Sequence, residues 1–333
     1  MKKKIALIYG GAGAEHAVSL MGHEHIWRKL NREKYEPYNI FINGSGAWYI
    51  QDNERETETF PVRLGGRSGF ISDGKILDCD CAFPLLHGDM GEDGCVQGAL
   101  ECAGIPYVGE NVQTGSLCID KSYTKAVAER LGIPTARWLS FRGRTDIALA
   151  ERMCSSYLGY PMFIKPTRLG SSVGASAVFR PSDFTNAFLN AMEQDGSVIV
   201  EELVIDKREL ELAYLCRFGE RIITAPAEVV CHGTYGYAEK YSGVTETLTV
   251  ADLPSDINNT LHEYSEKLIT ELDLRSISRI DFFLSQGKIF FNEINTMPGF
   301  TEESLYLKML EGYGISASEV IDTLIENAEG RQP

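Results

Sequence analysis

The segment from Arg279 to Asn295 places two carboxylates and an amide in an otherwise apolar stretch. It predicts two strands joined by a short turn at Gln286–Gly287. Because side chains alternate between the two faces of a strand, Arg279 shares a face with Asp281. By the same rule Glu293 shares a face with Asn295. A hairpin loop of three or five residues would bring both pairs to one side, with Asp281 opposite or diagonal to Glu293.

Carboxylates held close together among Ile, Leu and Phe side chains repel each other unless a cation lies between them. Oxygen ligands of this kind suit Mg²⁺, which proteins usually share with substrate phosphates. The alternative is an exposed hairpin face with solvated charges. The Pro298–Gly299 turn that follows disfavours this alternative, because it builds a loop over the acidic groups. We therefore expect a magnesium–nucleotide site at this hairpin.

The loop Lys165–Gly174 combines glycines, serines and a lysine at the end of a predicted strand. Glycines let backbone N–H groups approach phosphate oxygens, and a lysine supplies a compact positive charge. The order of residues is not that of a P-loop, and a strand rather than a helix is predicted to follow. The segment predicts a flexible lid over phosphates, and an exposed glycine turn is the alternative.

Further polar residues follow predicted strands in the first third of the chain. Glu15 lies where a glycine turn enters a helix, so it either stabilises the helix dipole or binds a substrate ammonium, and both interpretations stay open. The glycines of this turn do not match the dinucleotide-binding pattern. His87 ends a predicted strand, where open α/β sheets bind ligands, and could contact substrate. The acidic pair Glu92–Asp93 is expected to cap a helix rather than to form a catalytic dyad.

The segment Tyr235–Tyr241 lies in an irregular polar stretch, where Lys240 and Tyr241 could close over a ligand. Each of these segments is weak evidence alone, but their combination is specific.

Composition limits the class of protein. The chain has 333 residues and a formal net charge of −15, which argues against non-specific nucleic-acid binding because that needs a basic face. No apolar run approaches the ~20 residues of a membrane span, and the basic start has too short an apolar core for a signal peptide. The eight cysteines lack paired or zinc-like spacing, so we expect reduced thiols in the cytoplasm.

The order of predicted elements indicates an α/β protein of three parts. Residues 1–110 alternate strands and helices, which predicts a mostly parallel sheet with helices on both faces. Within them, residues 52–75 read as a loop or a surface hairpin. Residues 111–204 mix helices with the lid-bearing strands, and residues 205–333 are rich in strands and include the acidic hairpin. Without repeats or a low-complexity linker, the three domains should pack around shared clefts.

Over nearly its whole length the chain resembles the D-alanine–D-alanine ligases and their D-alanine–D-serine and D-alanine–D-lactate relatives, which are ATP-grasp enzymes. The motifs that carry the resemblance occur in the family's order: Gly10–Ser19, His87–Gly94, Ile119–Lys121, Lys165–Gly174, Glu201–Glu202 with Glu209, Glu239–Tyr241, Arg279–Asp281 and Asn292–Ser304. The resemblance implies an ATP-grasp fold, in which an N-terminal open parallel α/β domain joins two α+β domains that enclose ATP.

The resemblance also assigns roles to residues. Lys121 and Lys165 would bind ATP phosphates, with Lys240 at the γ-phosphate, and Glu209 would hold the ribose. Glu201 and the backbone near Leu203 and Val204 would hold adenine. The remaining implied ATP contacts are Ser171, Ser172, Glu202, Phe283 and Asn292. Two Mg²⁺ ions, which Mn²⁺ could replace, would be ligated by Asp281, Glu293 and Asn295.

On the substrate side, Glu15 would receive the ammonium of the first D-alanine within a set that includes Ser171 and Tyr241. His87 would also contact substrate. Arg279 and the backbone N–H of Gly299 would stabilise the tetrahedral oxyanion, and Ser304 would hold the carboxylate of the second substrate. The implied reaction is the ligation of D-alanine through a D-alanyl phosphate, which supplies a peptidoglycan precursor. A homodimer is expected by resemblance.

The identity of the second substrate stays open between two amino acids. Leu305, an apolar residue beside Ser304, favours the methyl group of D-alanine, and Tyr241 argues against D-lactate. The alternative is a D-alanine–D-serine ligase of the vancomycin-resistance type. Two other classes are weaker alternatives: a non-catalytic sensor on this fold, which would have lost a lysine or a metal ligand, and an ATP-grasp ligase with unrelated substrates.

Overall fold

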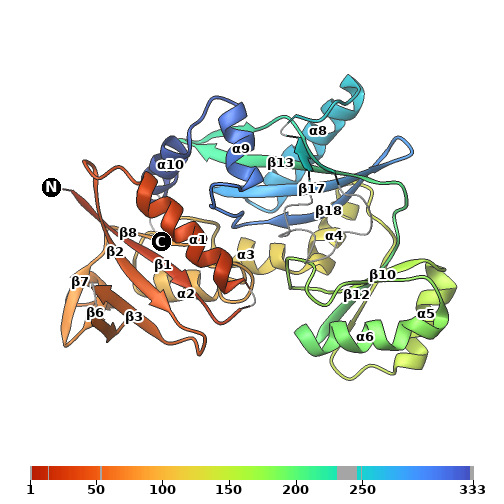
Figure 1. Cartoon of the computed structure of the whole chain (residues 1–333), viewed down its shortest axis with the longest axis horizontal. Coiled ribbons are helices and arrows are strands. Elements are labelled where there is room, and N and C mark those ends of the chain that lie inside the picture. Colours follow the sequence, from red (N-terminus) through yellow and green to blue (C-terminus); the bar gives the residue numbers. More distant parts are fainter. Residues whose placement is uncertain (1, 14, 53–54, 231–245, 249, 331–333) are drawn as a thin grey trace.

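The structure is a computed structural model that describes residues 2–13, 15–52, 55–230, 246–248 and 250–330. Figure 1 shows an N-terminal part, a smaller part that carries β10 and β12, and a C-terminal part built on β13, β17 and β18. No helix within these residues is long and apolar enough to cross a membrane.

The N-terminal sheet has the strand order β4-β3-β2-β1-β8. Its centre is parallel, as predicted: β1 (Lys3–Gly10) pairs with both β2 (Tyr35–Ile42) and β8 (Cys81–Pro84) in parallel. The antiparallel strands β3 (Trp48–Asp52) and β4 (Arg55–Glu58) extend one edge.

Helices cover both faces of this sheet because β1 is apolar on both sides. Alternate residues Ile5 and Leu7 pack in one hydrophobic cluster with α1 (His16–Lys29). Ala6 and Ile8 pack in another with α2 (Cys95–Cys102).

The region 52–75 is more ordered than a loop or a single hairpin. It contains β4 and most of a three-stranded antiparallel sheet, β5-β6-β7. Its strands are β5 (Phe60–Leu64), β6 (Arg67–Ser72) and β7 (Lys75–Asp78). The turns Gly65–Gly66 and Asp73–Gly74 have positive φ at both residues, which is the conformation that two-residue hairpins favour. The extent of this sheet was not predicted from the sequence, because these turn residues lie in a polar stretch that is also typical of a loop.

The smaller part is an antiparallel sheet of order β11-β10-β12-β9. Its strands are β9 (Trp138–Arg142), β10 (Met162–Pro166), β11 (Ser176–Val178) and β12 (Ser197–Glu202). The helices α5 (Ile147–Tyr157) and α6 (Pro181–Asp195) pack on it with a hydrophobic cluster of their own. This sheet carries the predicted phosphate lid between β10 and β11.

Two helices lead into this sheet, α3 (Val112–Ile119) and α4 (Lys121–Arg130). They belong to the hydrophobic cluster of the C-terminal sheet, because Cys118 and Ala128 pack with residues such as Phe282 and Phe291. The domain boundaries at residues 110 and 204 stay a prediction.

The C-terminal sheet has the order β16-β15-β13-β17-β18, and β14 pairs with β13. Its strands are β13 (Arg208–Arg217), β14 (Glu220–Ile223), β15 (Ala227–Val230), β16 (Glu246–Leu248), β17 (Ile277–Ser285) and β18 (Lys288–Asn295). The strands β14 and β15 are separated at Pro226, which lacks the N–H that a continuous ladder requires.

Three helices complete the described C-terminal part: α8 (Ser255–Glu271), α9 (Leu305–Gly312) and α10 (Ala317–Glu329). Figure 1 shows α10 beside α1, and the N- and C-terminal parts share one hydrophobic cluster. Phe300 and Tyr306 lie in it together with Phe83 of β8. The first and last parts of the chain are therefore held together by a common core.

Candidate active site

The acidic hairpin has the predicted arrangement of side chains but reaches it by a different route. The turn between β17 and β18 has two residues, since Ser285 pairs with Lys288. That register alone would place Asp281 opposite Asn292. A β-bulge between Asp281 and Phe282 leaves Asn292 as the extra residue and puts Glu293 directly across from Asp281. The predicted three- or five-residue loop is therefore wrong, and the bulge supplies the change of face instead.

Arg279 is fixed by two acids. Its Nε and one terminal nitrogen donate to the two carboxylate oxygens of Asp281 at 2.8 and 2.7 Å, and Nε also lies 3.0 Å from a carboxylate oxygen of Glu211 on β13. Although burial opposes the charge, Asp281 and Glu211 raise the pKa of the Arg279 guanidinium well above its usual value. The guanidinium is therefore held as a cation in one orientation.

The donor set at this hairpin fits a hard cation such as Mg²⁺. Asp281 and Glu293 face each other across the ladder, and Asn295 follows two positions along the same strand, opposite Arg279. All three offer oxygen atoms, which Mg²⁺ prefers. The described residues contain no group of three or more His, Cys, Asp or Glu side chains that could hold a metal, so the amide of Asn295 would have to complete the set.

Two lysines and the lid loop converge beside these acids. Lys121, the first residue of α4, donates from Nζ to the carbonyl of Leu169 at 2.8 Å, and Nζ lies 3.4 Å from Glu293. Lys165 of β10 lies 3.3 Å from the side-chain oxygen of Asn292. Positive φ angles at Ser171 and Ser172 show that the lid holds two non-glycine residues in a sparsely populated conformation, as functional loops often do.

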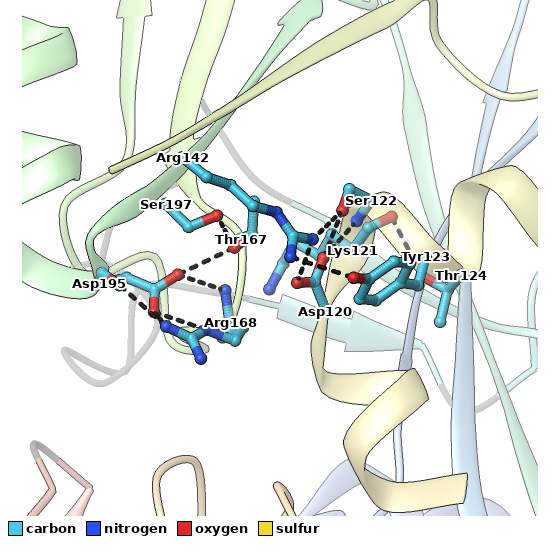
Figure 2. Close-up of polar contacts among 10 residues, drawn as sticks. All are labelled: Asp120, Lys121, Ser122, Tyr123, Thr124, Arg142, Thr167, Arg168, Asp195 and Ser197. Atoms are coloured by element: carbon cyan, nitrogen blue, oxygen red, sulfur yellow. Dashed lines mark hydrogen bonds and ion pairs between the residues drawn. The ribbon is translucent and has the colours of Figure 1, made fainter. Parts of the chain in front are cut away.

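Polar contacts anchor both ends of this arrangement, as Figure 2 shows. Arg168 and Thr167 at the base of the lid both bond to Asp195 at the end of α6. On the other side, Arg142 of β9 bonds to Asp120, which caps α4. The backbone N–H of Lys121 donates to the carbonyl of Thr167 at 3.0 Å, which joins the two halves. The start of α4 and the lid base are thus fixed relative to each other.

A cavity of 490 Å³ gathers most of the predicted ATP residues. The ones that line it are Lys121, Lys165, Ser171, Ser172, Glu201, Glu202, Leu203, Val204, Glu209, Phe283 and Asn292. The hairpin residues Arg279, Asp281 and Glu293 line the same cavity. A cavity of this size that combines apolar walls with a few charged groups is typical of a small-molecule site.

The adenine assignment of Glu201 needs refinement. Its carboxylate is bound by the ammonium groups of Lys125 and Lys165 at 2.9 and 3.0 Å. A contact from Glu201 to a base would therefore come from its backbone, next to Leu203 and Val204.

Glu15, the N-cap residue of α1, contacts the lid loop. The hydroxyl of Ser171 donates to the Glu15 carboxylate, although the two residues are 156 positions apart in sequence. Gly170 and Gly88 lie so close to this carboxylate that added Cβ atoms would stand 3.5 and 3.0 Å from it. Of the two interpretations of Glu15, this contact favours the substrate-binding one, because the carboxylate faces the lid.

His87 and Glu92 hold the loop that follows β18. The Nδ1–H of His87 donates to the carbonyl of Met297 at 3.0 Å, and a carboxylate oxygen of Glu92 accepts the N–H of Met297 at 3.0 Å. The other Glu92 oxygen accepts the N–H of Gly88 at 2.9 Å. Helix α2 begins later than expected, with Gly94 as its N-cap, so the predicted capping role of Glu92 is wrong.

The predicted subsite for the second substrate lies at the start of α9. Ser304 is the N-cap of this helix, and its hydroxyl oxygen accepts the N–H of Thr301 at 2.9 Å. A Cβ added at Gly299 would stand 2.8 Å from the same hydroxyl oxygen, so Gly299 and Ser304 are adjacent. Leu305 is partly buried and packs against the shared core. Lys240 and Tyr241 lie outside the described residues.

Sequence reasoning missed the contributions of Lys125 and Glu211. Lys125 follows Lys121 by four residues on α4, and Glu211 follows Glu209 by two on β13, so helix and strand periodicity place each on the face of a predicted site residue. That spacing was the available signal, but it could not show which partners they meet.

Comparison with known proteins gives matches over nearly the whole chain. The family model described as "D-ala D-ala ligase N-terminus" matches residues 4–110, and "D-ala D-ala ligase C-terminus" matches residues 127–326. The D-alanine–D-alanine ligase of Thermoanaerobacter sp. (strain X514) is 36% identical over 98% of this chain and 96% of its own.

Solved structures agree with this result. The VanG D-Ala:D-Ser ligase from Enterococcus faecalis has a TM-score of 0.89 at 32% identity, covering 98% of this chain and 100% of its own. The D-alanine–D-alanine ligase from Bacillus anthracis, solved as a complex with ATP, has a TM-score of 0.76 at 26% identity, covering 98% of this chain and 97% of its own. The predicted ATP-grasp fold is confirmed, and this chain belongs to the D-alanine–D-alanine ligase family.

Proposed function

We propose that this protein joins D-alanine to a second D-alanine at the expense of ATP, through a D-alanyl phosphate intermediate, and so supplies a peptidoglycan precursor. The observation that carries the proposal is the contact between Glu15 and Ser171. It brings a carboxylate that can bind a substrate ammonium against the lid loop, whose Ser171 lines the 490 Å³ cavity. A substrate amino acid and a nucleotide can therefore meet at one point.

In the first step the D-alanine carboxylate attacks the γ-phosphorus of ATP, the bond to the bridging β,γ-oxygen breaks, and ADP leaves. Lys121 and Lys165 offset phosphate charge from the cavity wall, and Lys240 is expected to act with them. Glu209 would accept hydrogen bonds from the ribose, and both Glu209 and Phe283 line the cavity. Mg²⁺ bound by Asp281, Glu293 and Asn295 would neutralise charge on the phosphate oxygens.

In the second step the free amine of the second amino acid attacks the acyl phosphate, and phosphate leaves. Arg279 and the N–H of Gly299 stabilise the tetrahedral oxyanion, while Ser304 holds the carboxylate of the attacking substrate. Met297, two residues before Gly299, is fixed by His87 and Glu92, which positions the loop that bears this N–H. Closure of the lid excludes water, which would otherwise hydrolyse the acyl phosphate.

A second candidate is a D-alanine–D-serine ligase. The likeness to the VanG D-Ala:D-Ser ligase from Enterococcus faecalis, with a TM-score of 0.89, favours it. The side chain of Leu305, which packs against the core beside Ser304, favours D-alanine instead, because it offers no polar group to a serine hydroxyl. We place D-alanine first on this local chemistry.

The test is ATP-dependent phosphate release with D-alanine alone, then with D-serine or D-lactate added, with each product identified by mass. A D-alanine dipeptide that persists when competitors are present at equal concentration supports the first candidate. Mixed dipeptide as the main product would establish the second candidate and refute the reading of Leu305. Absence of ATP-dependent phosphate release with every substrate pair would refute both.

Two further features belong to this proposal. A homodimer is expected by family resemblance, and sedimentation equilibrium of the purified chain would test it. We place the reaction in the cytoplasm, where ATP is available.

A further inference from the structure

The two lysines of α4 differ in what they face. Figure 2 shows the start of α4 with Lys121 directed to the base of the lid loop. Lys125 lies one helical turn further along the same face. Only Lys121 lines the ATP cavity, whereas Lys125 is 1% exposed and lies behind the cavity wall. A buried lysine is costly unless an acid pairs with it, so its partner decides its role.

The partner of Lys125 is shared with a residue of the cavity. The two carboxylate oxygens of Glu201 are divided between two ammonium groups: one lies 2.9 Å from Lys125 Nζ and the other 3.0 Å from Lys165 Nζ. Lys125 also donates to the carbonyl of Phe291 at 3.4 Å, next to Asn292, which Lys165 contacts. Lys125 therefore reaches the cavity only through Glu201.

Lys125, Glu201 and Lys165 form a triad with a net charge of one positive unit. Although burial alone would raise it, the two lysines lower the pKa of Glu201 to about 2, so its carboxylate stays ionised. Burial lowers the pKa of Lys125, and the ion pair with Glu201 opposes this shift. With both lysines protonated, two ammonium groups and one carboxylate sum to a single positive charge. Without Lys125, both Glu201 oxygens would be available to Lys165, and the pair that faces the cavity would be neutral.

We propose that Lys125 is a positioning residue that neutralises Glu201 and thereby leaves the charge of Lys165 available to the phosphates of the nucleotide. This inference rests on the proposed use of the cavity for ATP. Lys125 touches no ligand itself and acts on binding through Glu201. The alternative is a purely structural role, in which Lys125 only compensates a buried acid.

The number of phosphates on the ligand separates the two roles. Calorimetry measures the binding of adenosine, ADP and ATP to the wild-type chain and to Lys125→Met, without D-alanine. The two nucleotides are added together with Mg²⁺. Methionine nearly conserves the volume of the lysine side chain. Loss of the positive charge that lies behind Glu201 should weaken binding of the polyanionic ATP about tenfold or more. ADP should follow ATP, and adenosine should change by less than about twofold.

Two variants complete the experiment. Lys125→Met combined with Glu201→Gln removes the outer ion pair as a unit and again leaves one positive charge, so the ratio of ATP to adenosine affinity should return to within about threefold of wild type. If Lys125→Met alone does not fold, the double variant still allows the ratio of ATP to adenosine affinity to be measured, because the double variant buries no unpaired acid. The matched control is Lys267→Met, because it also removes a lysine that is paired with a glutamate. Lys267 is exposed on α8 and pairs with Glu263.

Each outcome decides the inference. Equal losses for adenosine and ATP in Lys125→Met, or unchanged ATP binding, would overturn it and leave a structural role. Failure of the double variant to recover the affinity ratio would overturn the charge argument. If the wild-type chain binds neither adenosine nor ATP, the proposed function fails instead, and that result is distinct from all of the others.

Discussion

Glu92 should make the stability of this protein decrease as the pH rises. Burial, together with the nearby charge of Glu15, raises the pKa of this carboxyl from its ordinary 4.5 to about 7, against the opposing hydrogen bonds from the N–H groups of Gly88 and Met297. In the folded state Glu92 therefore holds a proton over a range in which the unfolded chain has released it. Its contribution to stability is fully present below pH 4.5 and is lost as the pH rises to about 7.

The difference between the folded and unfolded pKa values of Glu92 determines how much unfolding free energy is lost as the pH rises. At 1.36 kcal/mol for each pH unit it corresponds to about 3 kcal/mol of unfolding free energy. The side chain keeps a partly exposed edge, so solvent screening reduces this to about 2 kcal/mol.

The assay compares urea unfolding of wild type and Glu92→Gln from pH 4.5 to 8. Because glutamine does not titrate, the free energy of unfolding of the variant should gain about 2 kcal/mol relative to wild type across this range. Glu36→Gln, at an exposed position of β2, controls for the loss of one carboxylate. A difference between wild type and Glu92→Gln that is constant with pH, or that changes in the opposite direction, would refute the reasoning.

Three further substitutions test the site and the core. Glu293→Gln should abolish phosphate release while the circular dichroism spectrum stays unchanged, because it removes a proposed metal ligand opposite Asp281; unaltered phosphate release would contradict the metal assignment. Ser171→Ala removes the hydroxyl that donates to Glu15, which should lower kcat/KM for D-alanine about tenfold to a hundredfold. Ser182→Ala, at an exposed serine of α6, is the control. Equal activity of wild type and Ser171→Ala would show that the contact with Glu15 has no catalytic role. Phe300→Ala should cost about 3–5 kcal/mol of unfolding free energy, because this side chain is fully buried against Phe83 where the first and last parts of the chain meet. Phe218→Ala, at a residue that is 65% exposed, should cost far less unfolding free energy. An equally small cost for Phe300→Ala would mean that the shared core does not depend on Phe300.

Local patterns in the sequence were sufficient to predict the strands and the loop that carry the site. Alternation of side chains identified the strands of the acidic hairpin and put Arg279 on the face of Asp281. Glycine spacing marked the lid beside Lys165, and the order of motifs identified the family. These features depend on residues close in sequence, where strand and helix periodicity alone decide which side chains share a face.

Contacts between distant segments were decided only by the tertiary structure. The bulge that turns Glu293 toward Asp281 depends on how β18 pairs with β17, and the sequence reading assigned that change of face to a longer loop. The same holds for Lys125 and Glu201, which come from a helix and a strand 76 positions apart and meet only because both pack behind one cavity wall. Sequence alone named the chemical groups of the site, whereas packing determined which charges neutralise each other, because electrostatic pairing depends on distances in space that no local period encodes.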